Sequence, residues 1–247
     1  MRHSNYWWYF MRPDDTASAV DDLILPPAPS TAPSVRTTRN TPRDTWSWLW
    51  KDTLGRVLPF ALAGAWYLRR ARRMAQPDAP SPRDIATELA LGLTVGVPMA
   101  AVAGAFRAWV APGYRLPTAA DQALQTAFYF AVNAPAEEMF WRGMVQTAAI
   151  NSLRRVPATR AAAPALGWAA ATGAFGAYHR LGRWSWRAIA GVTVAGGLFG
   201  ALYQMRPRSR RLLAPTIVHG FATAGFLSWG DAMLHARSQR RRVRVRP

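Results

Sequence analysis

The chain has 247 residues, half of them hydrophobic, and its 31 basic against 13 acidic residues give a formal net charge of +18. Cysteine is absent, which excludes disulfides, thiol catalysis and zinc or iron–sulfur sites built on cysteine. Apolar blocks separated by arginine clusters, together with 12 tryptophans, are typical of a membrane protein with basic loops and aromatic anchors. The same facts exclude a wholly soluble, disordered or collagen-like chain.

Residues 1–45 differ in composition from the rest of the chain. Four aspartates are followed by the proline-rich stretch LPPAPSTAPS, which leaves too little apolar surface to offset the entropy of ordering. We therefore predict a disordered segment over 1–45. Its aromatic start lacks the aliphatic run and cleavage site of a signal peptide, and could rest in a membrane interface.

Apolar blocks follow in sequence. The first, 54–68, is short for a membrane span, whereas the later blocks have about the length that crosses a hydrocarbon core, roughly 20 residues or more. These later blocks are 85–110, 123–153, 161–179, 188–205 and 212–229. We predict an all-α, polytopic transmembrane helical bundle of five to six spans, with room for one interfacial or re-entrant helix. Its parts are N-terminal membrane helices over 46–122, a core over 123–229 and a basic tail over 230–247.

Two further patterns concern packing and partners. The pairs Gly92/Gly96 and Gly196/Gly200 fit the small-xxx-small spacing of closely packed membrane helices, although glycine is also simply tolerated there. The arginine-rich tail is interpreted as a topology signal or a contact for anionic membrane lipid. Nucleic acid is not expected as a partner, because no aromatic interleaving or recognisable nucleic-acid fold accompanies the tail.

Rare polar residues fall inside the apolar blocks. Glu137 and Glu138 stand side by side in the third block, and His179 and His219 stand in the next and the last. A charged side chain in the bilayer core costs at least about 2.5–3.5 kcal/mol, so such residues need partners or a water-filled cavity. They are therefore the candidates for a functional site.

Helical spacing divides the third block into two faces. Glu138 and Arg142 are four residues apart and can form an ion pair, whereas Glu137 lies about 100° around the helix and can face a cavity. Pro135 removes a backbone donor just before the carboxylates and should kink the helix, which opens room for water. Taken alone, the Glu138–Arg142 pair has a purely structural interpretation.

The histidines suggest how the site could work. His219 and Thr223 are four residues apart and share a face, so Glu137, His179, His219 and Thr223 could converge if the helices bundle. A carboxylate and an imidazole can hold and deprotonate a water, while a second imidazole and a hydroxyl can stabilise an oxyanion. Individually, each histidine or threonine could equally serve helix packing.

These residues resemble a known family. EEMFWRG, residues 137–143, resembles the EExxxR signature of the CAAX prenyl protease and bacteriocin-processing (CPBP, or Abi) family of intramembrane endopeptidases. Phe175 followed four residues later by His179 matches the second motif, and LLAPTIVHGFAT, residues 212–223, matches the context of the third. The resemblance covers residues 123–229.

The resemblance implies an α-helical membrane bundle that cleaves peptide bonds at or in the membrane. The nearly all-arginine basic set and the alanine-rich composition point to a bacterial source, so we expect an integral protein of a bacterial inner membrane. It implies that Glu137 and His179 activate water and that His219 with Thr223 stabilises the oxyanion, while the orienting residues are Glu138, Arg142 and Phe175. We favour a metal-free glutamic peptidase without cofactor over zinc or another divalent metal, since such a site would have only Glu and His as ligands. The expected partners are membrane lipid and a peptide or protein substrate, such as a C-terminal or membrane-associated segment.

One position departs from the family pattern and keeps other functions open. Residue 223 is threonine where the family prefers Asn or Asp, so a catalytically weak or inactive relative with an immunity, binding or scaffold role is the alternative. A proton- or ion-coupled transporter would also use buried carboxylates, but it leaves the three motifs unexplained.

Overall fold

A computed structural model describes residues 42–75, 81–110, 118–182, 184–205 and 212–230, and every element in these ranges is helical. The all-α prediction is confirmed for this part of the chain. Residues 1–41, most of the predicted disordered segment, and the basic tail from 231 onward lie outside the described residues, as do the arginines of 206–211.

The first helical stretch begins before the first apolar block. Helix α2 (Pro42–Asp52) continues through the π-helical segment η2 (Thr53–Val57) into α3 (Leu58–Ala75). The boundary predicted at residue 45 therefore falls inside α2. Thr45 is completely buried, so packing of this turn against the bundle outweighs the polar composition of the preceding segment. The next helix, α4 (Pro82–Val110), corresponds to the second apolar block.

The third apolar block is a helical stretch interrupted by two π-helical segments. It comprises α5 (Ala119–Phe128), η3 (Tyr129–Asn133), α6 (Ala134–Glu138), η4 (Met139–Gln146) and α7 (Thr147–Arg155). The π turns flank Pro135, whose missing N–H prevents the regular α-helical ladder from continuing. Such π-helical insertions are frequent at functional sites, and here they bracket both glutamates.

The remaining elements complete the bundle. After a short 3₁₀ turn, η5 (Pro157–Thr159), come α8 (Ala163–Tyr178) and the 3₁₀ turn η6 (His179–Gly182). Helix α9 (Trp186–Gln204) is N-capped by Ser185, whose side chain accepts a hydrogen bond from the Ala188 amide. Helix α10 (Leu213–Ala224) continues into the π-helical segment η7 (Gly225–Trp229).

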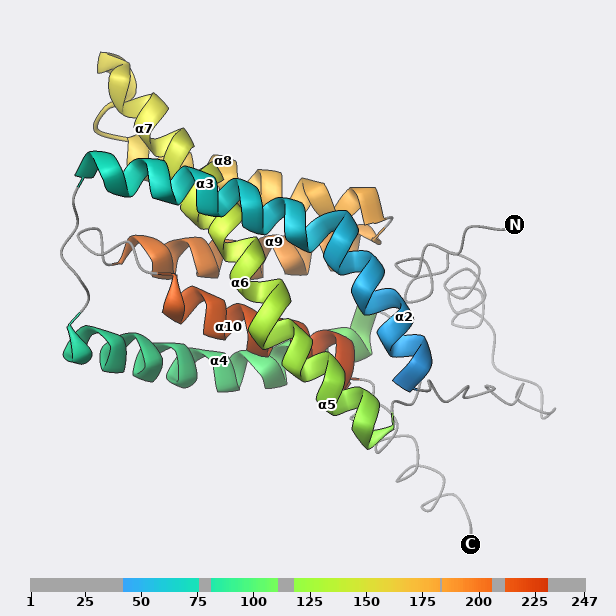
Figure 1. The fold of residues 1–247 in the computed structure, drawn as a ribbon. Coiled ribbons are helices and arrows are strands. Elements are labelled where there is room, and N and C mark those ends of the chain that lie inside the picture. The colour runs from blue at the N-terminus through green and yellow to red at the C-terminus, as the bar shows by residue number, and fades with distance from the viewer. Residues whose placement is uncertain (1–41, 76–80, 111–117, 183, 206–211, 231–247) are drawn as a thin grey trace, which may run out of the picture.

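Helix α10 lies in the middle of the bundle, between α4 and α9, while the α5–α7 stretch crosses it diagonally (Figure 1). Glycines permit these close approaches. A methyl group on Gly92 would meet Ile217 at 2.9 Å, and one on Gly196 would meet the Phe175 ring. Both glycine pairs noted in the sequence therefore lie where helices pack closely, as expected for small residues between membrane helices.

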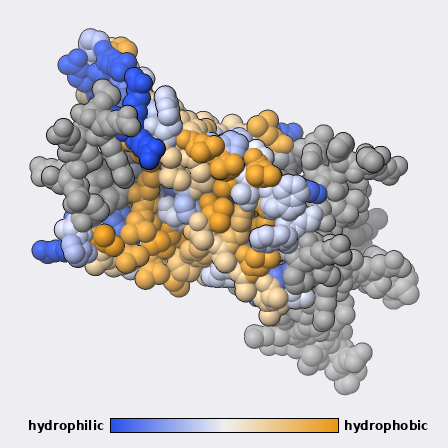
Figure 2. All heavy atoms as spheres, in the orientation of Figure 1, coloured by the Kyte–Doolittle hydropathy of each residue, from blue (hydrophilic) through white to orange (hydrophobic). Residues whose placement is uncertain are grey.

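The number of membrane spans predicted from the sequence is not established. Among the helices of the described residues, α4 alone has, over Pro82–Arg107, the length and apolar composition needed to cross a membrane. Many of its large apolar side chains face outward, and Val97 and Val102 are more than half exposed. Figure 2 shows hydrophobic residues spread over the middle of one face of the molecule, with the most hydrophilic group at one end.

Candidate active site

Glu137 lies at the centre of the polar cluster. Its Oε1 accepts hydrogen bonds from Asn133 Nδ2, at 2.9 Å, and from Arg56 Nη1. Its Oε2 lies 3.6 Å from His219 Nε2, beyond hydrogen-bonding distance but close enough for a shared water. The carboxylate is therefore anchored on one oxygen and leaves the other directed to the histidine side.

Glu138 is turned away from Glu137 and is completely buried. Its Oε1 lies 3.3 Å from Arg142 Nη1 and accepts a hydrogen bond of 2.8 Å from His219 Nδ1. The ion pair predicted from the four-residue spacing is confirmed. Because a carboxylate only accepts, the His219 proton must reside on Nδ1, which leaves Nε2 as an acceptor in the neutral ring and a donor in the imidazolium.

Arg142 connects this pair to the neighbouring helices. Its Nη2 donates to the Gly196 carbonyl at 2.6 Å, and its guanidinium lies over the Phe175 ring at 4.6 Å. The absence of a side chain at Gly196 is required here, because an added methyl group would collide with the Phe175 ring and lie 3.2 Å from the guanidinium. Arg142 therefore joins the glutamate helix to α8 and α9.

His179 ends α8 and is oriented by its own helix. Its Nδ1 lies 2.8 Å from the Phe175 carbonyl, and since a carbonyl only accepts, Nδ1–H is the donor. The Phe175 and Trp184 rings pack on the imidazole at centroid distances of 4.8 and 4.9 Å. Nε2 is left with a free lone pair, which is the tautomer that a general base requires.

Thr223 follows His219 by one turn of α10. Its hydroxyl makes no hydrogen bond within the part of the chain that the structure describes, whereas Thr193 donates to the carbonyl four residues earlier, at 2.7 Å. A threonine in a helix often makes that backbone bond. Thr223 retains its hydroxyl proton for another acceptor.

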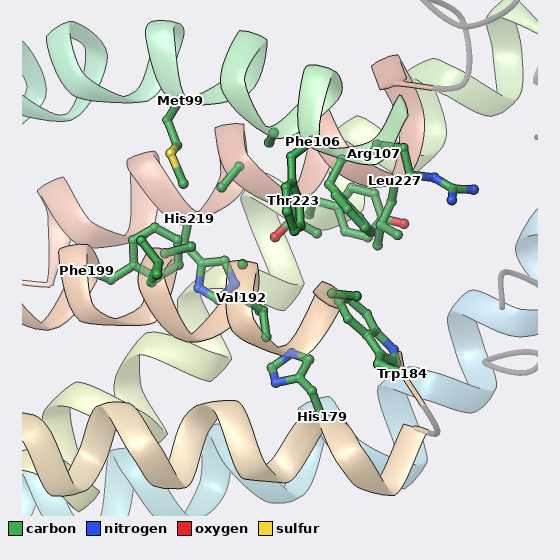
Figure 3. Close-up of a pocket in the computed structure, with 18 of the residues that line it drawn as sticks. Met99, Phe106, Arg107, His179, Trp184, Val192, Phe199, His219, Thr223 and Leu227 are labelled. Carbon is green, nitrogen blue, oxygen red and sulfur yellow. The ribbon is translucent and has the colours of Figure 1, made fainter. Parts of the chain in front are cut away.

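The predicted catalytic residues border one cavity of about 590 Å³, and Figure 3 shows both imidazoles and Thr223 around the same space. Glu137, His179, His219 and Thr223 line it, together with Arg56, Asp52 and Asn133, and the remaining wall is largely aliphatic and aromatic. Glu138, Arg142 and Phe175 do not reach the cavity and lie behind its wall. The catalytic and orienting roles of these residues stay predictions.

Within the described ranges, no group of three or more His, Cys, Asp or Glu side chains could hold a metal ion. Glu137 Oε1 is already engaged by the Arg56 guanidinium and the Asn133 amide, and a metal cation there would be repelled by the guanidinium.

One comparison with known proteins gives a match, to part of the chain. Residues 119–225 match the family described as type II CAAX prenyl endopeptidase, Rce1-like. Over this segment the chain is similar to the Rce1-like family. No curated protein and no solved structure matches the chain. The Rce1-like segment contains all the residues that the sequence motifs identified, and the family that it resembles is one of CAAX prenyl endopeptidases.

Two polar groups that bind Glu137 were missed by sequence reasoning. Asn133 lies four residues before Glu137, and this spacing alone could have predicted their hydrogen bond. Arg56 lies outside the Rce1-like segment, and only its position as a charged residue in an apolar block signalled a buried partner. The sequence pairs Arg142 with Glu138 and leaves Glu137 without an ionic partner, whereas in the structure Glu137 pairs with Arg56.

Proposed function

We propose that the protein is an intramembrane endopeptidase that hydrolyses a peptide bond with a water activated by Glu137 and His179. The observation that carries the proposal is the convergence of Glu137, His179, His219 and Thr223 on one cavity whose wall is largely aliphatic and aromatic. A buried carboxylate and two imidazoles are costly in such surroundings, and catalysis is a reason to keep them beside open volume.

The chemistry follows from the free atoms at the cavity. Glu137 Oε2 and His179 Nε2 would hold a water between them and take up one of its protons as its oxygen attacks the amide carbon. A carbon–oxygen bond forms and the carbonyl becomes an oxyanion. When the carbon–nitrogen bond breaks, the proton held by these bases passes to the leaving nitrogen, which yields a free acid and a free amine.

His219 and Thr223 would stabilise the oxyanion. The Thr223 hydroxyl is available to donate, and His219 Nε2 donates when the ring is an imidazolium between Glu138 and Glu137. Threonine in place of the family's Asn or Asp supplies a shorter donor, so turnover should be modest rather than absent.

The cavity favours a substrate that enters from the membrane. Its wall is mainly aliphatic and aromatic, and α4, which contributes part of this wall, also exposes apolar side chains on its outer surface. We propose a bacterial inner-membrane protein with five to six spans that cleaves near the lipid-modified or apolar C-terminal segment of a peptide or protein.

The test is cleavage by the purified protein in liposomes. The reporters are fluorogenic peptides that end in a prenylated cysteine motif, and the same peptides without the lipid. We expect cleavage by the wild type and a loss of about 10²–10⁴-fold in kcat for Glu137→Gln, the range a general base contributes. Thermal unfolding in detergent must show that the variant is folded.

The matched control is Glu88→Gln, because Glu88 is also buried but lies away from the cavity, where it accepts a hydrogen bond from the Ala214 amide. A glutamine oxygen can accept the same bond, so cleavage should be unchanged. Activity should also survive a chelator. Normal cleavage by Glu137→Gln would exclude the mechanism, and loss of activity on chelation would exclude its metal-free form.

A further inference from the structure

The N-terminal helical stretch contributes a charged side chain to the site of the Rce1-like segment. Arg56 lies in η2, well before residue 119 where the family match begins, and it reaches Glu137 across 81 positions of sequence. Its side chain is only 11% exposed and that of Glu137 only 6%. An ion pair so removed from solvent is screened weakly, unlike a surface pair.

Asp52 fixes the orientation of the Arg56 guanidinium. Arg56 Nε and Nη2 donate to the two carboxylate oxygens of Asp52, at 2.8 and 2.6 Å, in a bidentate pair one helical turn apart. This geometry leaves Nη1 to donate to Glu137. Because both planar groups are engaged side by side, the direction of Nη1 is set before any substrate arrives.

As a result, the two carboxylate oxygens of Glu137 have different surroundings. Arg56 and Asn133 both bind Oε1, so the carboxylate cannot rotate without breaking two hydrogen bonds. Oε2 remains on the side of His219 and the cavity. Catalysis needs the reacting groups held to within a fraction of an ångström, and displacement by about 1 Å can cost 10²-fold in rate.

Resting on the proposed function, we propose that Arg56, anchored by Asp52, is a positioning residue that holds Glu137 through Oε1 and presents Oε2 to the attacking water. The active site is then not confined to the Rce1-like segment. The N-terminal helix completes it by contributing a guanidinium that the family motifs do not include.

The first experiment probes Glu137 without relying on cleavage. The membrane-permeant reagent dicyclohexylcarbodiimide modifies carboxylic acids in their protonated form, so a carboxylate paired with a guanidinium is protected. In the full-length protein in liposomes, Arg56→Gln should raise labelling of Glu137 by about tenfold, as quantified by mass spectrometry of the peptide that contains it. Labelling of the adjacent Glu138, paired with Arg142, should not change.

Further variants separate positioning from general damage. Arg56→Lys keeps the charge without the bidentate fork and should give intermediate labelling. Asp52→Asn removes the anchor and leaves Glu137 untouched, so it should act in the same direction but less strongly. Arg69→Gln, on the exposed surface of α3, makes the same change away from the site and should label like the wild type. If Arg56→Gln fails to fold, the Lys and Asn variants carry the test.

The second experiment measures cleavage by the same variants. A positioning residue that acts through Glu137 should lower kcat by about 10²-fold in Arg56→Gln with KM unchanged, and Arg56→Lys should recover part of the loss. In a Glu137→Gln background the Arg56 substitution should have no further effect, because the residue that it positions is already disabled.

The outcomes distinguish the two proposals. If the wild type cleaves no reporter but Glu137 labelling responds to Arg56, the proposed function fails and the positioning of Glu137 stands. If Glu137 labelling is indifferent to Arg56, or if Arg56→Gln cleaves as fast as the wild type, the positioning role is overturned while the proposed function survives. Faster cleavage by Arg56→Gln would also overturn the positioning role, because the Arg56–Glu137 ion pair would then inhibit cleavage.

Discussion

Two groups of polar side chains lie a few ångströms apart in this protein and differ in what surrounds them. The cavity layer comprises Glu137, His179, His219 and Thr223, which border open volume. The support layer comprises Glu138, Arg142 and Phe175, which lie behind the cavity wall; the guanidinium lies over the Phe175 ring and Glu138 is fully buried. The layers meet at His219, which donates to Glu138 and stacks on Phe199 with centroids 4.7 Å apart.

The two layers differ in whether their side chains border the cavity, not in residue type. Glu137 and Glu138 are neighbours in sequence and each is paired with a guanidinium, yet one helical step places the first at the cavity and the second behind its wall. Only the cavity layer keeps atoms that a water or substrate could reach. Substitutions in the support layer should therefore act mainly on folding, and substitutions in the cavity layer mainly on turnover.

The largest expected effect on stability is at Arg142. Arg142→Met keeps much of the side-chain volume but leaves the buried Glu138 without its guanidinium and the Gly196 carbonyl without its donor. Breaking one partner of a buried pair costs about 3–5 kcal/mol, so thermal unfolding in detergent should occur at clearly lower temperature and folded yield should fall.

Arg154→Met is the control for this prediction, since Arg154 is exposed on α7 and most surface substitutions change stability by less than about 0.5 kcal/mol. A normal unfolding temperature for Arg142→Met would show that the support layer does not stabilise the fold, and the distinction between the layers would be lost.

A smaller effect, on rate alone, is expected at Thr223. Thr223→Val removes the hydroxyl with little change of shape, and the loss of one oxyanion donor costs about 10²–10³ in turnover. Thr216→Val, the same replacement on α10 away from the cavity, should leave kcat unchanged. Thr223→Asn should in turn raise kcat, because the longer amide donor reaches further; equal rates for all three variants would remove Thr223 from the site.

Sequence reasoning predicts what depends on spacing within one helix. The Glu138–Arg142 pair and the shared face of His219 and Thr223 follow from a four-residue separation, and the block 85–110 closely matches α4. Spacing also predicts that Glu137 faces a different side from Glu138. Each of these features needs only the helical period and the cost of burying charge.

Sequence reasoning misses contacts that depend on how helices pack. The pairs Arg56–Glu137 and Glu138–His219 each span 81 positions, and no local pattern specifies that separation. The predicted number of spans relied on block length, whereas π-helical segments divide the third block and extend α10. Interruptions of this kind follow from local hydrogen bonding around Pro135 and from tertiary packing, neither of which block length measures.

The smallest expected effect tests whether polar bonds further from the cavity matter for activity at all. Thr147 donates to the Arg142 carbonyl at 3.0 Å and bonds the Tyr203 hydroxyl at 2.9 Å, but it does not border the cavity. Thr147→Val removes both bonds while preserving shape, which should lower the free energy of unfolding by about 1 kcal/mol and leave kcat and KM unchanged. A fall in kcat would mean that these bonds also tune the geometry of the cavity, through the helix that carries both glutamates or through Tyr203 on α9.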